Sequence, residues 1–447
     1  MSQEHIAVIG AGLVGSLQAL FIAKRGYRVS TFDRRPDIRK AELVAGRSIN
    51  LALSDRGWKA LEAVGIGDAV KDMAIPMKGR MIHDVEGNLS FQPYGREGEA
   101  IYSVSRGGLN QILLEWADKN DHVSLHFNEK CKDIDLRTNQ AVFKNTESGE
   151  LSSHQFDRIF GTDGAFSAVR SRMQKTDRFN YSQEYLTHGY KELTIPPNAD
   201  GTHKMEVSAL HIWPRGEYML IALPNLDGSY TVTLFFPFEG KDSFESLTTP
   251  EDVMEFFNRM FPDAVPLMPD LVDDYFENPT SSLVMIKCFP WHYEDKVLIM
   301  GDASHAIVPF YGQGMNSGFE DCTVFENIFS EENGDWARAF KRMSIERKPD
   351  ADAILELAVN NYIEMRDLTA DPEFILQKKI EKRFANRHPD KWIPLYEQVT
   401  FTHIPYAEAL AAGKRQDAIM KKVMDRSDIE EVWDSEEVEK AIMAHLD

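Results

Sequence analysis

Residues 298–321 read LIMGDASHAIVPFYGQGMNSGFED, and this stretch decides the fold. The apolar run Val297–Met300 predicts a buried strand, which leaves the sheet sharply at Gly301 and Asp302. Gly312–Asn316 then forms a glycine-rich turn directly before a helical pattern. Helix N-termini and uncovered backbone amides attract anions. Each glycine pair alone would suit an ordinary crossover, but the assembled string predicts a turn that holds a phosphate or the edge of a flavin ring.

A second glycine-rich turn lies near the start of the chain. The apolar run His5–Ile9 predicts a strand, Gly10-Ala11-Gly12-Leu13-Val14-Gly15 follows it, and a helical pattern comes next. The next apolar run, Tyr27–Phe32, ends in Asp33, which lies 18 residues beyond Gly15. An acid at that distance can accept hydrogen bonds from a ribose diol. The context is that of the dinucleotide-binding fingerprint and predicts a Rossmann-like α/β unit.

A third turn follows the apolar run Arg158–Phe160. It reads Gly161-Thr162-Asp163-Gly164-Ala165-Phe166-Ser167-Ala168-Val169-Arg170. The three turns are far apart in sequence yet must meet at one cofactor, so we expect the nucleotide-binding domain to be discontinuous.

The order of these motifs, GxGxxG, DGxxSxVR and GDAxHxxxPxxGxGxN, resembles the single-component flavoprotein aromatic hydroxylases. Within that group, further blocks resemble the kynurenine 3-monooxygenase family, from the first strand to about Ile404. The blocks are Arg47–Ser54 (RSINLALS), His188–Tyr190, Glu192–Pro197, His211–Arg215 and Asn361–Arg366. One departure is Ser304, where many relatives have alanine.

The resemblance implies an enzyme that binds FAD, accepts hydride from NADPH and uses O2. It implies hydroxylation of L-kynurenine to 3-hydroxy-L-kynurenine through a flavin C4a-hydroperoxide, a step of tryptophan degradation. The cofactor carries the difficult chemistry in such enzymes, so no catalytic acid or base is assigned. His305 lies in the last motif, and we expect it to be structural.

The resemblance also implies which residues contact FAD. Arg106 is expected to meet the flavin or its diphosphate, Asp302 the ribityl or diphosphate region, and Met315 with Asn316 the ring edge through backbone amides. Cys131 is expected to touch the adenine end through its main chain, and Asp163 to serve NADPH as well as FAD. The full predicted set is Gly10, Gly12, Val14, Gly15, Phe32, Asp33, Arg34, Arg35, Ala52, Arg106, Cys131, Asp163, Asp302, Met315 and Asn316.

Four residues are implied to bind the substrate carboxylate. Arg80 can donate two parallel hydrogen bonds to a carboxylate, and Tyr94 lies beyond a turn at 84–88, so the two could meet across a hairpin. Asn361 and Tyr396 match the family's other positions and come from a helical region. Aromatic residues could line a slot for the substrate ring or could be plain core, namely Phe310, Tyr311, Phe236 and Phe238.

Composition excludes several classes of protein. The formal charge of −21 argues against a nucleic-acid or anionic membrane surface, because phosphate repels such a chain. The three cysteines, Cys131, Cys288 and Cys322, are far apart and lack metal-ligand spacing, so we expect no disulfide framework and no metal site. We expect no signal peptide and no transmembrane segment, and a cytoplasmic location. A homodimer is possible.

The chain is predicted to combine a Rossmann-like FAD-binding domain, an inserted antiparallel-sheet substrate domain and a C-terminal helical region. The tail from Ala407 has apolar residues at helical spacing and is expected to pack on the protein or on a partner. The predicted strands of the substrate domain are Gly189–Ile195, Val207–Trp213, Tyr218–Ala222 and Tyr230–Phe236. The predicted helices are Asp321–Ser330, Trp336–Glu346 and Pro349–Arg366. The predicted domains are 1–75, 100–175 and 290–330 for FAD, 76–99 and 176–289 for substrate, and 331–447 for the helical region.

Three other functions stay open. A flavin hydroxylase of another aromatic acid, such as a phenol or benzoate, would share all three cofactor motifs and differ only in its pocket. A non-catalytic flavoprotein, such as a redox sensor, would keep FAD without turnover. A plain NAD-dependent dehydrogenase would suit Asp33 but would leave the second and third motifs without a use.

Overall fold

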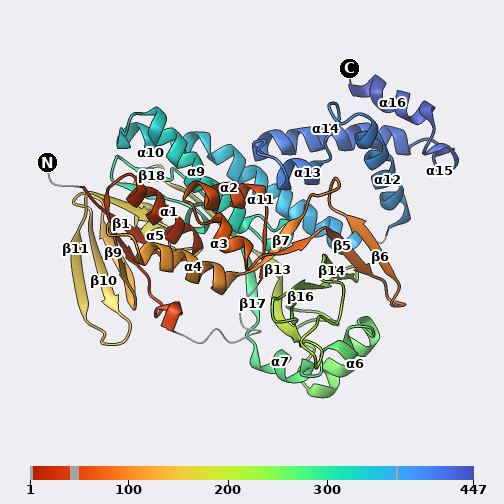
Figure 1. Cartoon of the computed structure of the whole chain (residues 1–447), viewed down its shortest axis with the longest axis horizontal. Helices are drawn as coiled ribbons and strands as arrows, with labels where there is room; N and C mark the ends of the chain where they lie inside the picture. The colour runs from red at the N-terminus through yellow and green to blue at the C-terminus, as the bar shows by residue number, and fades with distance from the viewer. Residues whose placement is uncertain (1–3, 41–49, 369–370, 447) are drawn as a thin grey trace.

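The computed structural model describes residues 4–40, 50–368 and 371–446, and it confirms the predicted α/β class. A six-stranded sheet has the order β18-β19-β12-β1-β2-β8 and is parallel except for the pair β18 and β19 (Figure 1). Its strands are β1 (His5–Ile9), β2 (Arg28–Phe32), β8 (Val123–His126), β12 (Arg158–Gly161), β18 (His292–Tyr293) and β19 (Val297–Ile299). The three strands predicted before the glycine-rich turns are therefore neighbours in one sheet.

Helices and two small sheets surround this sheet. Helix α1 (Leu13–Lys24) is buried from Gly15 to Ala23, because it lies against the sheet and against other helices. The other helices here are α2 (Asp55–Ala63), α3 (Gly67–Lys71), α4 (Arg106–Asp118), α5 (Ala168–Met173), α8 (Asp302–His305), α9 (Gly314–Glu331) and α10 (Trp336–Glu346), with the 3-10 turn η1 (Ile38–Lys40). The small sheets are β3 (Asn50–Leu53), β7 (Ile101–Ser105) and β4 (Ile75–Met77), and β11 (Leu151–Gln155), β10 (Gln140–Asn145) and β9 (Glu129–Asp135).

The second large sheet has seven strands in the order β17-β13-β16-β15-β14-β5-β6. They are β5 (Gly79–His83), β6 (Leu89–Pro93), β13 (Asn180–Ile195), β14 (Ala209–Pro214), β15 (Met219–Pro224), β16 (Tyr230–Pro237) and β17 (Ser281–Phe289). The predicted antiparallel pairing is wrong at one place, because β5 and β14 run parallel. The hairpin β5–β6 comes from a distant part of the chain, so no tight turn fixes its direction relative to β14.

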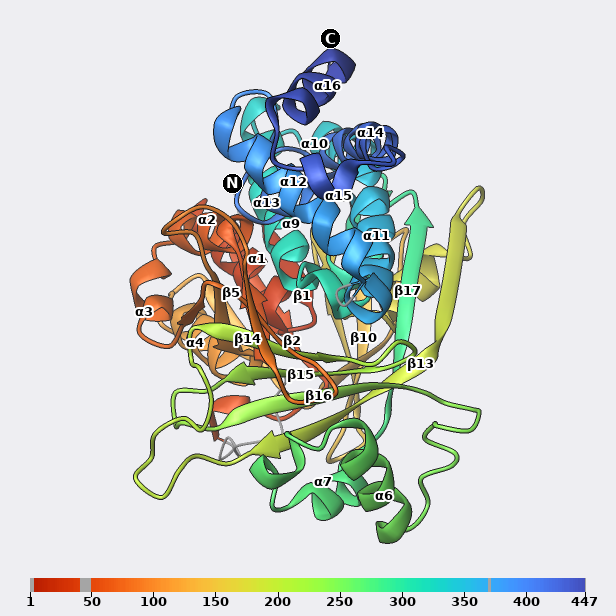
Figure 2. The same cartoon turned by 90° about the vertical axis from the view of Figure 1, so that its right-hand side faces the viewer.

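The two faces of the seven-stranded sheet have different partners. One face packs against α6 (Pro250–Met260) and α7 (Leu271–Glu277), with η2 (Val265–Leu267) between them, and its core contains Trp213 and Phe236. The other face turns toward η3 (Pro309–Tyr311) and α11 (Lys348–Ile363), and its core contains Ile82 and Phe235. Figure 2 shows α6 and α7 below the sheet and the C-terminal helices above it.

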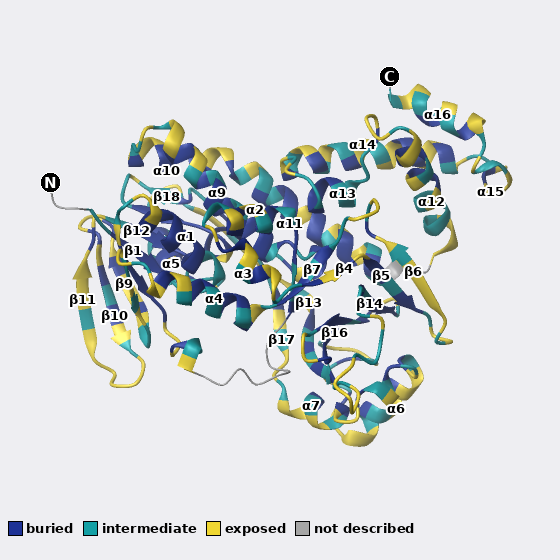
Figure 3. Ribbon diagram, viewed as in Figure 1, coloured by how far each residue is buried: buried dark blue, intermediate teal, exposed yellow. Residues whose placement is uncertain are grey.

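The C-terminal region is helical, as predicted. Its helices are α12 (Pro372–Arg387), α13 (Leu395–Thr400), α14 (Tyr406–Met424), α15 (Ile429–Val432) and α16 (Glu436–Leu446). The apolar residues of the tail, Ile419, Val423, Ile429, Val438 and Ile442, are buried in a small core of their own with Phe384 and Trp392. Figure 3 shows the alternation of buried and exposed positions along these helices. The tail therefore packs on the protein itself.

Several elements differ from their predicted lengths. Helix α9 begins at Gly314, seven residues before its predicted start at Asp321. Helix α11 ends at Ile363 and is followed by a π-helical turn, η4 (Glu364–Leu368), inside the span predicted as one helix. Strand β13 begins at Asn180, nine residues before its prediction, because its first part pairs with β17 on the edge of the sheet. Among the described residues, no helix is both long and apolar enough to cross a membrane.

Candidate functional site

One cavity of about 570 Å³ runs between the two large sheets. All three glycine-rich turns line it, together with strands of the seven-stranded sheet and residues of the C-terminal region. Its volume lies in the range of small-molecule sites. The structure therefore brings the three predicted motifs to one binding site.

The first turn is shaped by close backbone contacts. Gly10 has a φ of +105°, and a Cβ there would lie 2.4 Å from the carbonyl oxygen of Thr162. A Cβ on Gly15 would lie 1.8 Å from the carbonyl oxygen of Gly10, so Gly15 allows the helix to approach the strand and does not line the cavity. Gly12 and Val14 do line it. Gly12 caps α1 with no side-chain hydrogen bond within the described chain, which leaves the helix N-terminus suited to a phosphate.

Asp33 follows β2 and lines the cavity with Phe32, Arg34 and Arg35. Its carboxylate accepts hydrogen bonds from the backbone N–H of Ala11 at 3.0 Å and from the Nε of Arg35 at 3.0 Å. The Nη2 of Arg35 lies 3.0 Å from the second carboxylate oxygen, and this hydrogen bonding raises the pKa of Arg35. A ribose diol at Asp33 would therefore share or replace the bonds of Arg35.

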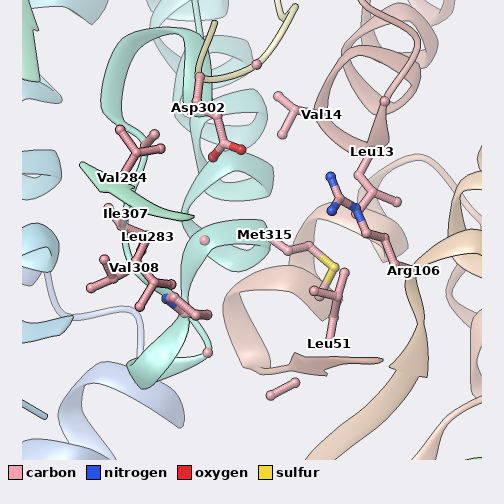
Figure 4. A pocket seen from close by; sticks show the side chains of 18 of the residues that line it. Leu13, Val14, Leu51, Arg106, Leu283, Val284, Asp302, Ile307, Val308 and Met315 are labelled. Atoms are coloured by element: carbon pink, nitrogen blue, oxygen red, sulfur yellow. The ribbon is translucent and has the colours of Figure 1, made fainter. Parts of the chain in front are cut away.

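Charged groups face each other across the middle of the cavity. Figure 4 shows Asp302 on α8 and Arg106 at the start of α4 on opposite walls, with Met315 between them. Asp302 is exposed and lines the cavity. Desolvation by the protein around the cavity raises the pKa of Asp302, and Arg106 partly offsets the effect. Ala52 on β3 lines the same part of the wall.

The second motif fixes its own turn. The carboxylate of Asp163 accepts hydrogen bonds from the Ser167 hydroxyl and from the N–H of Ala168 at 2.6 Å, so it caps α5. Arg170 donates from Nη1 to the carbonyl oxygen of Ala303 at 2.9 Å and so ties this turn to the third one. Asp163 lines the cavity, and burial raises its pKa.

Cys131 lies on β9 and lines the cavity near Lys130. Burial raises the pKa of its thiol to about 12. The thiol therefore stays protonated at neutral pH.

Two asparagines from the predicted site lie behind the cavity wall and hold its backbone by hydrogen bonds. Asn316 donates to the carbonyl oxygens of Ala52 at 2.8 Å and Gly312 at 2.7 Å, and it accepts from the N–H of Ser54 at 3.0 Å. Asn361 donates to the carbonyl oxygen of Phe310 at 2.7 Å. Neither lines the cavity; Asn316 holds the turn at Gly312, and Asn361 holds Phe310 just before that turn.

His305 has a structural place. Its Nε2 lies 2.6 Å from Asp321, whose other oxygen accepts from the Nε of Arg347 at 2.9 Å. Burial opposes ionisation of Asp321, but His305 and Arg347 outweigh it and hold the pKa of Asp321 below its ordinary value. His305 does not line the cavity, as expected for a residue without a catalytic role.

One end of the cavity contains a cluster of one arginine and three tyrosines. The Cζ of Arg80 lies 5.6 Å from the ring centre of Tyr94 and 5.1 Å from that of Tyr396. The ring of Tyr396 stacks on Tyr94 at 5.0 Å and on Tyr311 at 5.5 Å. Arg80 and Tyr94 meet across the β5–β6 hairpin, as predicted. No pattern in the sequence indicated that Tyr311, considered only for the ring slot or the core, would join this stack.

Two polar atoms of this cluster are buried without a hydrogen-bond partner among the described residues. They are the Nε of Arg80 and the hydroxyl of Tyr94. The Nη1 of Arg80 lies 3.4 Å from Glu364, in the π-helical turn that follows Asn361. Buried polar groups without partners are rare in folded proteins and need an explanation. An anionic ligand at this place would supply the missing partners.

Four aromatic residues were considered for the ring slot or for the core. Phe310 and Tyr311 line the cavity, and Phe236 and Phe238 do not. Phe235 lines the cavity beside Phe310 and Tyr311, whereas Phe236 is buried on the opposite face of the sheet against α6. Neighbouring residues of a strand point to opposite faces, so Phe235 faces the cavity while Phe236 belongs to the core, the other alternative considered for it. Phe238 is absent from the described lining. Residues Arg47–Ile49 of the RSINLALS block lie outside the described residues.

Comparisons with known proteins agree over nearly the whole chain. The FAD binding domain family matches residues 3–357. The kynurenine 3-monooxygenase of Flavobacterium johnsoniae is 56% identical over 99% of this chain and 98% of its own length. That of Anopheles gambiae is 47% identical over 94% of this chain and 86% of its own length.

Solved structures share the fold at low sequence identity. The tetrameric form of 2-methyl-3-hydroxypyridine-5-carboxylic acid oxygenase has a TM-score of 0.67 and 18% identity, over 86% of this chain and 97% of that chain. A probable FAD-dependent monooxygenase from Pseudomonas aeruginosa has a TM-score of 0.64 and 17% identity, over 82% of this chain and 97% of that chain.

Proposed function

The chain belongs to the kynurenine 3-monooxygenase family of FAD-binding proteins, and from this premise we propose that it hydroxylates L-kynurenine to 3-hydroxy-L-kynurenine with FAD, NADPH and O2. The observation that carries the proposal is the buried pair of unpartnered atoms on Arg80 and Tyr94, at one end of the cavity that the glycine-rich turns line. Bound FAD would supply the redox chemistry, taking hydride from NADPH and activating O2. The residues of the chain bind, orient and exclude water.

The cavity suits FAD along its length. Gly12 and Val14 at the N-terminus of α1 would hold the diphosphate, with Arg106 as a cation facing it. Asp302 would bind the ribityl region by hydrogen bonds. The ring edge would lie against Met315 and Ala52, whose positions are fixed by Asn316. The adenosine end would lie by Phe32, Asp33, Arg34, Arg35 and Cys131, next to the turn of Asp163.

Arg80 would hold the substrate carboxylate through two parallel hydrogen bonds. The hydroxyl of Tyr94 would donate a further one, and Tyr396 would stack over both. Asn361 would act beside them through the carbonyl of Phe310, which it holds. When the carboxylate is bound in this way, the aromatic ring of the substrate would extend along the cavity toward the turn at Gly312.

Apolar residues would keep water from the reacting ring. Phe235, Phe310 and Met219 line the substrate end of the cavity. A wet site would release hydrogen peroxide in place of product, so the dryness of this wall bears on the yield of hydroxylation. No side chain is assigned as an acid or base, since His305 is committed to Asp321.

Three further assignments belong to the proposal. The FAD-binding domain comprises 1–75, 100–175 and 290–330, the substrate domain 76–99 and 176–289, and the helical region 331–447. The enzyme works in the cytoplasm. It acts on a small molecule, without nucleic acid, and a homodimer is compatible with it.

The test is an assay of purified protein that carries bound flavin. NADPH oxidation is followed with and without L-kynurenine, and the product is identified by mass spectrometry. We expect a substrate-dependent rate, a product heavier by one oxygen atom, and loss of both in Arg80→Ala with FAD retained. Bound FAD with a response to a different aromatic acid only would overturn the assignment to kynurenine. Absence of turnover with any aromatic acid would favour a non-catalytic flavoprotein.

A further inference from the structure

Arg56 is a fully buried arginine that the proposed reaction does not use. It lies on α2, and 0% of its side chain is exposed. Its Nε donates to the carbonyl oxygen of Val399 at 3.0 Å, and its Nη2 donates to those of Gln398 at 3.5 Å and of Ile404. Its Nη1 pairs with Glu320 on α9. One guanidinium thus binds three backbone carbonyls of the C-terminal region.

Two of these carbonyls belong to the last turn of α13. The final carbonyls of a helix lack partners inside the helix, and a cation near them is favourable. Arg56 supplies both the hydrogen bonds and the charge. Because α13 has only six residues, it depends on such outside contacts for its position.

A second contact fixes α13 from the other side. A Cβ on Gly413 of α14 would lie 2.7 Å from a methyl carbon of Leu395, so the missing side chain lets α13 lie close to α14. Helix α13 is therefore held between the guanidinium of Arg56 and the backbone of α14.

Helix α13 carries Tyr396 into the cavity. The ring of Tyr396 lies between Tyr94 and Tyr311 at stacking distances of 5.0 Å and 5.5 Å. It also lies over Arg80. Tyr396 is two and three residues before the carbonyls that Arg56 binds, less than one helical turn. A shift of the end of α13 would consequently move the ring against Arg80 and Tyr94.

We propose that Arg56 is a positioning residue for substrate recognition, which sets Tyr396 through the C-terminus of α13. The inference rests on the proposed function for the identity of the substrate. Lysine cannot replace Arg56, because a single ammonium group does not offer the planar set of donors that three separate carbonyls require.

Arg347 provides a matched control. It is a second buried arginine of the same cluster and pairs with Glu320 and Asp321. It also donates to the carbonyl oxygen of Ser317 and, like Arg56, lies against the ring of Tyr406. None of the hydrogen bonds described for Arg347 goes to α13. Arg347→Lys therefore tests the loss of a buried guanidinium without the loss of the α13 anchor.

The experiment compares Arg56→Lys, Arg347→Lys and Tyr396→Phe, and the double variant Arg56→Lys with Tyr396→Phe, as flavin-loaded proteins. Kynurenine affinity is measured from the absorbance change of the flavin, FAD affinity by titration, and hydrogen–deuterium exchange over 395–400 by mass spectrometry. We expect Arg56→Lys to weaken kynurenine binding at least about fivefold, to leave FAD affinity unchanged and to speed exchange in α13. The double variant should lose less than the sum of the single losses.

Two results would overturn the inference. One is unchanged exchange in α13 in Arg56→Lys, and the other is an equal loss of kynurenine affinity in Arg347→Lys. If Arg56→Lys does not fold, Gly413→Ala displaces α13 from its other side and is expected to weaken kynurenine binding in the same way. If the unaltered protein does not bind kynurenine, the proposed function fails, while the exchange of α13 still decides whether Arg56 anchors it.

Discussion

The two faces of strand β5 carry opposite kinds of polar group. On one face, Arg80 points into the cavity, where its Nε and the hydroxyl of Tyr94 lack partners among the described residues. On the other face, every ring nitrogen of His83 and of its neighbour His211 has a partner. The two residues of β5 are three positions apart and so point to opposite sides of the sheet. A single strand thus combines a site prepared for a ligand with a closed structural network.

The closed face contains a chain of three hydrogen-bonding contacts. His83 Nδ1 lies 2.8 Å from Asp263, His83 Nε2 lies 2.9 Å from His211 Nδ1, and His211 Nε2 lies 2.8 Å from the carbonyl oxygen of Glu206. The carboxylate and the carbonyl at the two ends of the chain only accept hydrogen bonds. The two rings are therefore held between two acceptors, and each ring nitrogen has a partner.

Burial affects the charge of two groups in this network. Burial lowers the pKa of His211 to about 4, so its ring is neutral at pH 7. Burial opposes the ionisation of Asp263, but the hydrogen bonds of His83 and Trp213 outweigh it and lower the pKa of Asp263. The hydrogen-bonded polar groups on the closed face stabilise the fold, whereas the polar groups without partners on the open face are suited to bind a ligand. The comparison predicts that changes on the closed face alter folding and that changes on the open face alter binding.

The largest expected effect is on the closed face. Asp263→Ala leaves the Nδ1 of His83 and the indole N–H of Trp213 without their shared acceptor, which should lower the free energy of unfolding by about 3 kcal/mol. Kynurenine affinity of the folded fraction should not change. Urea denaturation measures the first quantity, with the exposed Asp273→Ala on α7 as a control expected to stay within about 0.5 kcal/mol. A loss of kynurenine affinity without a loss of stability would contradict the assignment of the closed face to folding.

Low pH should lower the free energy of unfolding through His211 on the same face of the sheet. Because the folded-state pKa of His211 is about 4 and its ordinary value is 6.5, its contribution is complete above pH 6.5 and is lost as the pH falls toward 4. The loss for this residue is about 3 kcal/mol at pH 4. Denaturation of the unaltered protein and of His211→Gln between pH 7 and pH 4 measures it, and parallel curves would show that His211 does not contribute.

The next effect is on the open face. Arg80→Met keeps most of the apolar stem and removes the guanidinium, so kynurenine binding should weaken by about 2 kcal/mol, or about 30-fold. The denaturation midpoint should not fall, because an unpartnered buried nitrogen is removed at the same time. Arg415→Ala, at an exposed position of α14, is the control for loss of a positive charge. Unfolding of Arg80→Met would mean that Arg80 holds the fold.

The smallest expected effect concerns the hydroxyl of Tyr94 on the open face. Tyr94→Phe removes only the unpartnered hydroxyl, so kynurenine binding should weaken by about 1 kcal/mol, or about fivefold, and stability should stay level or rise slightly. Parallel titration and denaturation measure both quantities. A clear fall in stability would show that the hydroxyl has a structural partner.

The cofactor turns could be predicted from the sequence because each is a local pattern. The strands before Gly10, Gly161 and Gly301 appear in one sheet, and helix α10 has its predicted bounds, Trp336–Glu346. Glycine positions followed from backbone geometry, as at Gly10 and Gly15. Such features depend on neighbours in the chain, which a single sequence displays.

Long-range contacts could not be predicted in this way. The stack of Tyr311 on Tyr396 and the ion pair of Arg80 with Glu364 join segments far apart in the chain. Arg56 also gave no signal, because an arginine early in a helix is usually exposed and its carbonyl partners have no side-chain signature. The choice between Phe235 and Phe236 depended on a strand register that composition does not fix.

Glu364 gives the ligand-free pocket an internal competitor. It lies 3.4 Å from the guanidinium of Arg80, at the place where a substrate carboxylate would bind. An aromatic molecule without an acid group cannot take the arginine from Glu364 and gains only apolar contacts. An aromatic acid exchanges one carboxylate for another and adds the hydrogen bond of Tyr94. The ligand-free pocket therefore favours aromatic acids, because only an acid can replace the carboxylate of Glu364 at Arg80, whereas a neutral aromatic molecule leaves that ion pair in place.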